Sequence, residues 1–393
     1  MPSYKYLIIG GGVTADAAIA GIREIDHEGS IGVISAESYP PYNRPPLSKG
    51  LWKGKALEDI FRQATPGNAQ LHLESKAVSI NPEEHIVVDD QHQQYNYQKL
   101  LLATGGSPRR LPFGGDDLIY FRTLEDFKHL HSLVGNSAKF ALIGGGFIGS
   151  ELASILSEQG QEVVMLFPEV GIGSLIFPAD LSNFLNDYYR QRGVTVLAGE
   201  LVNDIDSQTQ GFTIKTKSGS SVSADHVIAG IGILPNTSLA EAAGIEVNNG
   251  IVVDQYLETS QADIYAAGDV ANIQNSLLDI RQRVEHEDNA LSSGKAAGRN
   301  MAGKPVPYEH LSYFYSDMFD LGYEAVGELN PKHEIFSDWQ DPYRKGVVYY
   351  LKGSQLRGVL LWNVWGQVDA ARQLIRASGP FSKEDLVGRL PAD

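Results

Sequence analysis

The stretch Tyr4–Ala15, with the sequence YKYLIIGGGVTA, decides the fold of this chain. Its apolar run Tyr4–Ile9 predicts a buried strand, and the pattern over Ala15–Ile25 predicts a helix. Between them lies the first fingerprint, Gly10-Gly11-Gly12-Val13-Thr14-Ala15. Because glycines carry no side chain, they allow a tight turn and let a dinucleotide's pyrophosphate come close to the helix N-terminus. We therefore assign all six residues of this motif to cofactor binding.

An acidic residue follows at the distance that such a motif requires. Ile31–Ser35 is typical of a second strand, and Glu37 comes 22 residues after Ala15. A carboxylate at this point can accept hydrogen bonds from the adenosine ribose. The simpler interpretation is an ordinary glycine turn, but the strand, the helix and the acid together favour a dinucleotide site.

A second fingerprint, Gly144-Gly145-Gly146-Phe147-Ile148-Gly149, lies between a predicted strand at Ala138–Ile143 and a predicted helix at Phe147–Gln159. Glu169 comes 20 residues after its last glycine, beyond the predicted strand Glu162–Phe167. An acid there pairs with a free 2′-hydroxyl and repels a 2′-phosphate, so NADH is favoured over NADPH. Two such motifs in one chain indicate two dinucleotides, a flavin and a nicotinamide, and hence hydride transfer from NADH to FAD.

The remaining pattern alternates short apolar runs with helical periodicity, which is typical of α/β folds with parallel sheets. We expect two Rossmann-like dinucleotide-binding domains and a C-terminal α/β domain. The expected domains are an FAD domain at 1–117 and 243–309, an NAD domain at 118–242 and the C-terminal domain at 310–393. Further strands are expected at Glu84–Asp89, Tyr95–Ala103, Val194–Leu197, Tyr313–Tyr315, Val347–Leu351 and Gly358–Leu361. Further helices are expected near Leu47–Trp52 and at Leu181–Arg190, Val284–Met301, Val368–Ala377 and Lys383–Arg389.

The composition limits the function classes. The chain has 393 residues, a net charge of −16 and no cysteine. The missing thiols exclude disulfides, thiolate metal ligands and a cysteine nucleophile, and we assign no metal ligands. The acidic balance argues against binding to nucleic acid. No uncharged apolar stretch is long enough for a membrane span, and the apolar run at Tyr4–Ile9 leaves no room for a targeting segment, so we expect a cytoplasmic location.

Two further motifs, Ala103-Thr104-Gly105-Gly106 and Ile264–Asp269, resemble those of the FAD-dependent pyridine nucleotide oxidoreductases. This resemblance implies FAD and NAD domains like those of glutathione reductase. More discriminating stretches resemble the apoptosis-inducing-factor family; they are Pro41–Trp52, Arg283–Asn289, Tyr315–Asp317, Gly322–Ala325, Gly346–Tyr350 and Leu361–Asn363. Besides the first fingerprint, the resemblance implies FAD contacts from Glu37, Arg44, Lys49, Val78, Arg109, Asp269, His286 and Glu287. Besides the second fingerprint, it implies NADH contacts from Glu169, Gly232, Glu285, Tyr315, Glu324 and Asn363.

The predicted catalytic residues are Lys49, Glu151, Phe147 and His286. Phe147 and Glu151 are four residues apart and therefore share one helix face. Phe147 could wall the nicotinamide slot, while a Lys49–Glu151 pair near the flavin's reactive edge would tune its potential. Without the resemblance, Lys49 would equally be a surface charge, His286 a core or capping histidine, and Tyr315 a strand residue.

Some positions depart from the animal members of that family. Tyr315 stands where they have tryptophan, and Ser174 replaces a lysine expected near the NADH phosphates. The resemblance also raises a redox-dependent homodimer, although Val253 and Gln261 stand where the animal proteins have their dimer-bridging arginines.

The absence of cysteine removes every thiol relay, so electrons must leave the flavin for a quinone, oxygen or a redox protein. The leading hypothesis is an NADH:acceptor flavoprotein of the apoptosis-inducing-factor type. A ferredoxin or rubredoxin reductase is the second hypothesis, because those enzymes share the scaffold and also need no cysteine. A flavoprotein that binds a partner under the control of NADH is the third.

Overall fold

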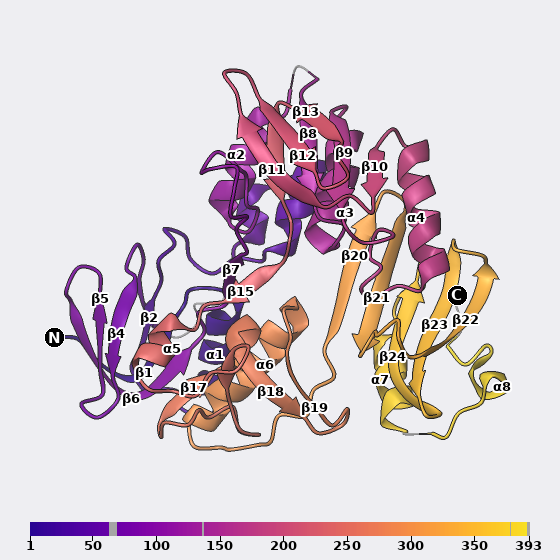
Figure 1. The fold of residues 1–393 in the computed structure, drawn as a ribbon. Helices are drawn as coiled ribbons and strands as arrows, with labels where there is room; N and C mark the ends of the chain where they lie inside the picture. The colour runs from indigo at the N-terminus through magenta and orange to yellow at the C-terminus, as the bar shows by residue number, and fades with distance from the viewer. Residues whose placement is uncertain (63–68, 136, 378, 391–393) are drawn as a thin grey trace. The chain divides into compact units, whose positions relative to one another are not determined.

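The computed structural model describes residues 1–62, 69–135, 137–377 and 379–390 (Figure 1). Two compact units divide the chain. The first contains Met1–Asn43, Ala56–Ser107 and Leu234–Ser312, and the second contains Arg44–Lys55, Pro108–Ile233 and Tyr313–Asp393. Strands β7 (Gly106–Pro108) and β15 (Ile233–Pro235) lie where the chain passes from one unit to the other. The predicted α/β fold is confirmed, whereas the division into three domains stays a prediction.

The first unit is built on a parallel sheet that begins with the strand of the first fingerprint. Strands follow the order β3-β2-β1-β6, with β17 also paired to β6. All four pairings are parallel. Their bounds are β3 Ala69–His72, β2 Ile31–Ile34, β1 Ser3–Ile9, β6 Gln94–Leu102 and β17 Ile264–Ala266. Antiparallel β4 (Ala77–Asn81) and β5 (Ile86–Asp89) extend the sheet.

Two helices of this unit cross at very short range. They are α1 (Val13–Arg23) and α6 (Glu287–Met301). A Cβ at Gly294 would lie 2.4 Å from the Thr14 carbonyl oxygen, and one at Gly298 would lie 2.1 Å from that of Ala18. Only glycine permits this contact between the two backbones. The remaining elements of the unit are η3 (Leu57–Ile60), α5 (Ser238–Ala242), β16 (Ile251–Val252), η4 (Gly268–Val270), β18 (Ala271–Asn275) and β19 (Ile280–Arg283).

The second unit contains the other parallel sheet, in the order β10-β9-β8-β14. The strands are β10 Thr195–Ala198, β9 Glu162–Phe167, β8 Lys139–Ile143 and β14 His226–Ala229. The helices around it are α2 (Leu124–Leu133), α3 (Phe147–Glu158) and α4 (Ala179–Gln191). An antiparallel sheet follows, made of β11 (Val202–Ser207), β12 (Phe212–Thr216) and β13 (Ser221–Ala224).

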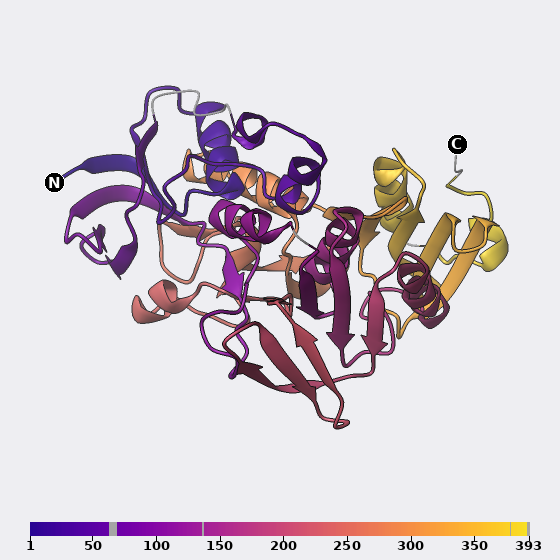
Figure 2. The ribbon, with the colours of Figure 1, turned by 90° about the horizontal axis from the view of Figure 1, so that it is seen from above.

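The C-terminal part of the second unit is a five-stranded antiparallel sheet in the order β20-β21-β24-β23-β22. The strands are β20 Tyr313–Met318, β21 Leu321–Gly327, β22 Glu334–Asp341, β23 Lys345–Lys352 and β24 Gln355–Trp362. Helix α7 (Val368–Arg376) packs on β21 and β24 (Figure 2), and the short α8 (Lys383–Leu386) follows. Four large aromatic side chains of this sheet are fully buried: Tyr323, Tyr349, Tyr350 and Trp362.

Three predicted helices need correction. The one expected at Lys383–Arg389 is the short α8, which ends at Leu386. In place of the helix near Leu47–Trp52 there are two 3-10 turns, η1 (Pro45–Ser48) and η2 (Gly50–Lys53). They are separate because Lys49, with φ −141° and ψ −95°, breaks the helical path. Helix α6 starts at Glu287 rather than Val284 because strand β19 extends to Arg283.

Candidate functional site

The first fingerprint forms an open cradle at the N-terminus of α1. Gly10 has φ +113°, and a Cβ there would lie 2.1 Å from the Ala103 carbonyl oxygen. Gly12 is the N-cap of α1, has no side-chain cap and leaves nothing within 4 Å of where its Cβ would be. The start of the helix therefore has no side-chain cap and leaves space beside Gly12, as a pyrophosphate site requires. Glu37, which accepts a hydrogen bond from Tyr42 Oη at 2.6 Å, follows β2.

The region around Asp269 and His286 forms a second group in the first unit. Ser293 Oγ accepts a hydrogen bond from the Gly268 amide at 3.0 Å, which ties η4 to α6. His286 is the N-cap of α6, directly before Glu287. Desolvation lowers the pKa of His286 to about 4, against the opposing effect of the Asp269 and Asp288 carboxylates. The imidazole is therefore neutral at pH 7.

Arg283 links two of the predicted cofactor residues, although it is not among the site residues predicted from the sequence. Its side chain is 9% exposed and forms an ion pair with Glu285 at 2.5 Å. Its Nη1 also donates to the Asp269 carbonyl oxygen at 3.2 Å. It belongs to the Arg283–Asn289 motif, which is the sequence signal that could have identified it.

The second fingerprint repeats the cradle at α3. Gly144 has φ +117°, and a Cβ there would lie 2.3 Å from the Gly230 carbonyl oxygen. Gly146 is the N-cap of α3, without a side-chain cap and with nothing within 4 Å of a Cβ position. Glu169 follows β9, and its backbone carbonyl accepts the Gly199 amide at 2.9 Å. The residues of both fingerprints thus fit the two dinucleotides that the sequence predicts.

The predicted Lys49 and Glu151 form a buried ion pair within the second unit. The side chains are 15% and 5% exposed, respectively. Ser48 Oγ donates to Glu151 Oε2 at 2.5 Å, and Ser316 Oγ donates to Glu151 Oε1 at 2.6 Å. One cation and two hydroxyls thus satisfy this carboxylate, which is what a buried charge requires. Nothing in the sequence pattern singled out the two serines.

Aromatic side chains adjoin this ion pair. Phe147, 38% exposed at the first position of α3, meets Phe314 edge to face with ring centroids 5.3 Å apart. Lys49 Nζ lies 5.4 Å from the centre of the Tyr315 ring. Tyr315 is opposite Glu324 in the β20–β21 pairing. Lys49 between η1 and η2, the N-terminal part of α3 and the β20–β21 hairpin therefore bring a cation, a carboxylate and aromatic rings together.

Asn363 begins the loop that follows β24, and Glu324 of β21 bonds to the same loop. The Gly366 amide donates to Glu324 Oε2 at 3.3 Å, and desolvation raises the pKa of Glu324. Asn363, with φ +49°, accepts the Gly322 amide at its Oδ1 at 2.7 Å. Both predicted residues are therefore held in the same part of the C-terminal sheet.

The other predicted residues are distributed over the two units. Arg44 Nη1 donates to the Arg122 carbonyl oxygen at 2.8 Å. The Arg109 amide donates to the Gly232 carbonyl oxygen at 2.9 Å. Val78 is an exposed residue of β4 in the first unit. The cofactor roles of these residues stay predictions.

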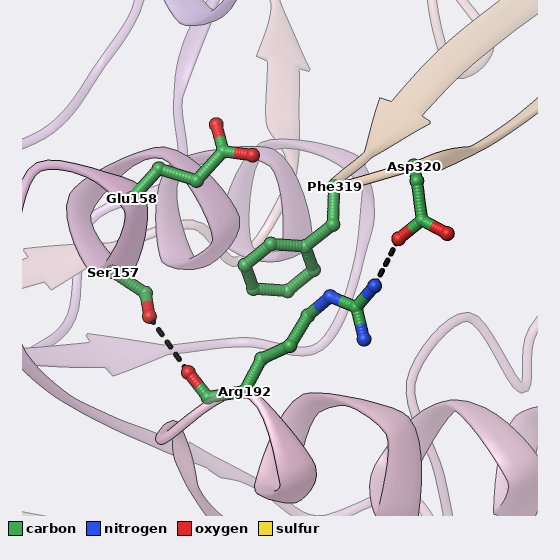
Figure 3. Close-up of a pocket in the computed structure, with 5 residues that line it drawn as sticks. All are labelled: Ser157, Glu158, Arg192, Phe319 and Asp320. Carbon is green, nitrogen blue, oxygen red and sulfur yellow. Dashed lines mark hydrogen bonds and ion pairs between the residues drawn. The ribbon is translucent and has the colours of Figure 1, made fainter.

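A cavity of about 430 Å³ opens beyond the other end of α3 (Figure 3). It is lined by Ser157, Glu158, Arg192, Phe319 and Asp320. Arg192 forms an ion pair with Asp320, and its guanidinium lies 3.8 Å from the Tyr188 ring centre and 5.1 Å from that of Phe319. None of the predicted cofactor residues lines it, and its charged groups join α4 to the β20–β21 turn.

Comparison with known proteins decides the family. The family model described as pyridine nucleotide-disulphide oxidoreductase matches residues 4–294, which is most of the chain. This chain belongs to that family. A second model, described as the C-terminal region of mitochondrion-associated apoptosis-inducing factor, matches residues 328–377. The chain has no cysteine, so it cannot form a disulfide of its own.

Two curated relatives and one solved structure show which kinds of protein the chain resembles. Apoptosis-inducing factor 1 of Dictyostelium discoideum, described as mitochondrial, is 36% identical, and the match covers 95% of this chain and 78% of the relative. Monodehydroascorbate reductase 3 of Arabidopsis thaliana is 33% identical over 91% of this chain and 89% of its own. The covalent putidaredoxin reductase–putidaredoxin complex matches with a TM-score of 0.91 and 29% identity, covering 98% of this chain and 95% of that one.

The resemblance to apoptosis-inducing factor is therefore confirmed, and the chain is an FAD-dependent oxidoreductase that uses a nicotinamide nucleotide. The open cradles at Gly12 and Gly146 are consistent with this pair of cofactors. Among the residues that the structure describes, no helix is both long and apolar enough to cross a membrane.

Proposed function

We propose that the protein is an NADH oxidoreductase of the apoptosis-inducing-factor type that delivers electrons to a non-thiol acceptor. The observation that carries this proposal is the buried Lys49–Glu151 pair beside Phe147 at the start of the second-fingerprint helix. FAD, when bound, supplies the hydride acceptor and stores the electrons. The first fingerprint with Glu37 would hold it, and the second fingerprint with Glu169 would hold NADH.

The protein groups supply positioning and fixed charge, since a hydride transfer needs no acid or base from the protein. Phe147 presents a partly exposed ring at the mouth of the α3 cradle, where it can orient a planar nucleotide end. Glu151, with its partners Lys49, Ser48 and Ser316, is a fixed dipole that does not need to reorganise during turnover. His286 stays neutral at pH 7 and adds no charge to the flavin region.

The preference for NADH rests on Glu169, since a carboxylate repels the 2′-phosphate of NADPH. The loop between Glu169 and Asp180 contains no lysine or arginine that could bind that phosphate. The cytoplasmic location and the redox-dependent homodimer stay predictions from the sequence.

Stopped-flow reduction of the FAD-loaded protein by NADH tests this function, followed by a panel of quinone, oxygen and protein acceptors. We expect flavin reduction and a long-wavelength band of reduced flavin with NAD⁺ that persists in air. A flavin that NADH leaves oxidised would contradict the proposal. Rapid reoxidation with no such band would contradict the apoptosis-inducing-factor type.

A ferredoxin-type reductase is the second candidate. The likeness to the reductase of the putidaredoxin complex favours a protein carrier as acceptor, and so does the absence of cysteine. The net charge of −16 disfavours an acidic carrier unless a local basic patch guides docking. NADH-dependent cytochrome c reduction should be measured with and without an added ferredoxin; a rate that ferredoxin leaves unchanged removes this candidate.

A further inference from the structure

One aromatic residue outside the predicted site is unusually exposed. The chain has four tryptophans, of which Trp52 and Trp362 are buried and Trp339 is partly buried. Trp365 is 53% exposed. A large exposed indole offers more binding surface than almost any other side chain, and tryptophan is enriched where proteins bind their partners and ligands.

The loop that carries this indole is fixed at both ends. At one end, the Asn363 amide donates to the Gly322 carbonyl oxygen at 2.8 Å, and Asn363 Oδ1 accepts the Gly322 amide at 2.7 Å. At the other end, Glu324 accepts the Gly366 amide at 3.3 Å. The backbone of this loop is therefore already ordered before a ligand contacts Trp365, which lowers the entropic cost of binding.

The ring itself rests on a glycine. A Cβ at Gly322 would lie 2.7 Å from Trp365 Cη2 and 2.8 Å from Cζ2, closer than carbon atoms can approach. Gly322 is buried under the indole, and its φ requires no special residue. The glycine therefore makes room for the ring, and any larger residue would push the indole off the strand.

Register places Trp365 beside the candidate site. In the β20–β21 pairing, Tyr315 is opposite Glu324 and Asp317 is opposite Gly322. These four residues share one face of the hairpin, because side chains alternate along a strand. The Trp365 ring rests on Gly322, so it lies over the pair that is next to Tyr315–Glu324 on this face. The Tyr315 ring in turn contacts Lys49. Lys49 forms an ion pair with Glu151 of α3, four residues after Phe147, the first residue of this helix.

We propose that Trp365 is a further binding residue for the nicotinamide nucleotide, with the indole packing against the nucleotide's planar end beyond Tyr315. This assignment rests on the proposed function, in which the second fingerprint holds NADH. The partial burial of Glu324 supports a binding surface at the same place. A carboxylate that is already partly shielded from water beside a fixed indole is suited to contact a ligand.

The test uses the FAD-loaded protein in its oxidised state and NAD⁺ as the probe. Trp365→Ala should weaken NAD⁺ binding about tenfold, as for loss of one base-stacking ring, while Trp365→Phe should change it less than about threefold. Gly322→Ala keeps the tryptophan but displaces its ring, and should weaken binding to a similar degree. Trp339→Phe is the matched control, since β22 is the opposite edge of the same sheet from β20.

Tryptophan emission gives a second readout that activity does not. NAD⁺ should change the emission of the native protein and of Trp339→Phe, and this change should be lost in Trp365→Phe. Native affinity in Trp365→Ala overturns the assignment. The assignment is also overturned if Trp365→Ala binds NAD⁺ more weakly but NAD⁺ still changes the emission of Trp365→Phe as it does that of the native protein. The indole would then not contact the nucleotide. A native protein that neither binds NAD⁺ nor is reduced by NADH would instead reject the proposed function itself.

Discussion

Ser316 Oγ donates to Glu151 Oε1 at 2.6 Å, joining the edge strand of the C-terminal sheet to the helix of the second fingerprint. The two residues are 165 positions apart in the chain. Because the other Glu151 oxygen accepts from Ser48, the carboxylate is held by three separate elements: η1, α3 and β20. The fixed charge near Phe147 is therefore a property of the folded second unit rather than of the fingerprint alone.

Removing Ser316 should show how much this link contributes. Ser316→Ala removes one hydrogen bond to a buried ionised acceptor, so we expect a loss of about 2 kcal/mol in the free energy of unfolding. FAD should stay bound, because the first fingerprint lies in the other unit. Urea denaturation of the FAD-loaded protein checks the loss. Ser337→Ala on β22, measured in parallel, should lower the free energy of unfolding far less. Equal losses in the two variants would show that the hydrogen bond from Ser316 to Glu151 adds no particular stability.

Lys49 and Glu151 should be strongly coupled. Lys49→Ala leaves a buried carboxylate with two hydroxyls and no cation, so we expect a destabilisation of about 3 kcal/mol and slower flavin reduction by NADH. Lys49→Ala/Glu151→Gln removes the unpaired charge and should recover most of the stability. A double-mutant cycle with Glu151→Gln measures the coupling. Additive losses, with native reduction kinetics in each variant, would remove the pair from the site.

Much of this site could be predicted because it depends on backbone constraints that leave a trace in the sequence. Gly10 and Gly144 must be glycine, since both have positive φ and lie against a neighbouring carbonyl. Lys49 lies in a proline-bounded motif, which made it recognisable although its turn is not helical. In contrast, Ser48 and Ser316 are common polar residues whose importance arises only when distant elements pack together.

Some strands could not be predicted from the sequence for a related reason. The β11–β13 sheet is made of short polar segments with an interrupted alternation, and a bulge shifts its register near Val202. Hairpin pairing rather than side-chain pattern determines such strands. Trp365 was missed because an aromatic residue after a strand is normally part of the core, and only the structure reveals its exposure.

The choice of nucleotide should depend on Glu169. Glu169→Arg replaces a group that repels the 2′-phosphate with one that binds it, so we expect the kcat/KM ratio of NADH to NADPH to fall at least about tenfold, or roughly 1.4 kcal/mol. Steady-state kinetics with both nucleotides measure this ratio. Glu162→Arg, at the exposed start of β9, is the charge-matched control and should leave it unchanged. An unaltered ratio in Glu169→Arg would place the adenosine ribose elsewhere.

His286 should make the protein less stable in mild acid. Its pKa of about 4 in the folded chain is below the usual value near 6.5, so between these two values the unfolded state binds more protons. The contribution of His286 to the free energy of unfolding is therefore fully present above about pH 6.5. It declines as the pH falls toward 4, by at most about 3 kcal/mol. His286→Gln cannot be protonated and should lose less stability than the native protein between pH 7 and pH 5. Urea unfolding at several pH values compares the two proteins, which share the His310–Asp288 contact. Parallel curves for the two proteins would mean that the His286 imidazole is solvated rather than held neutral at the start of α6.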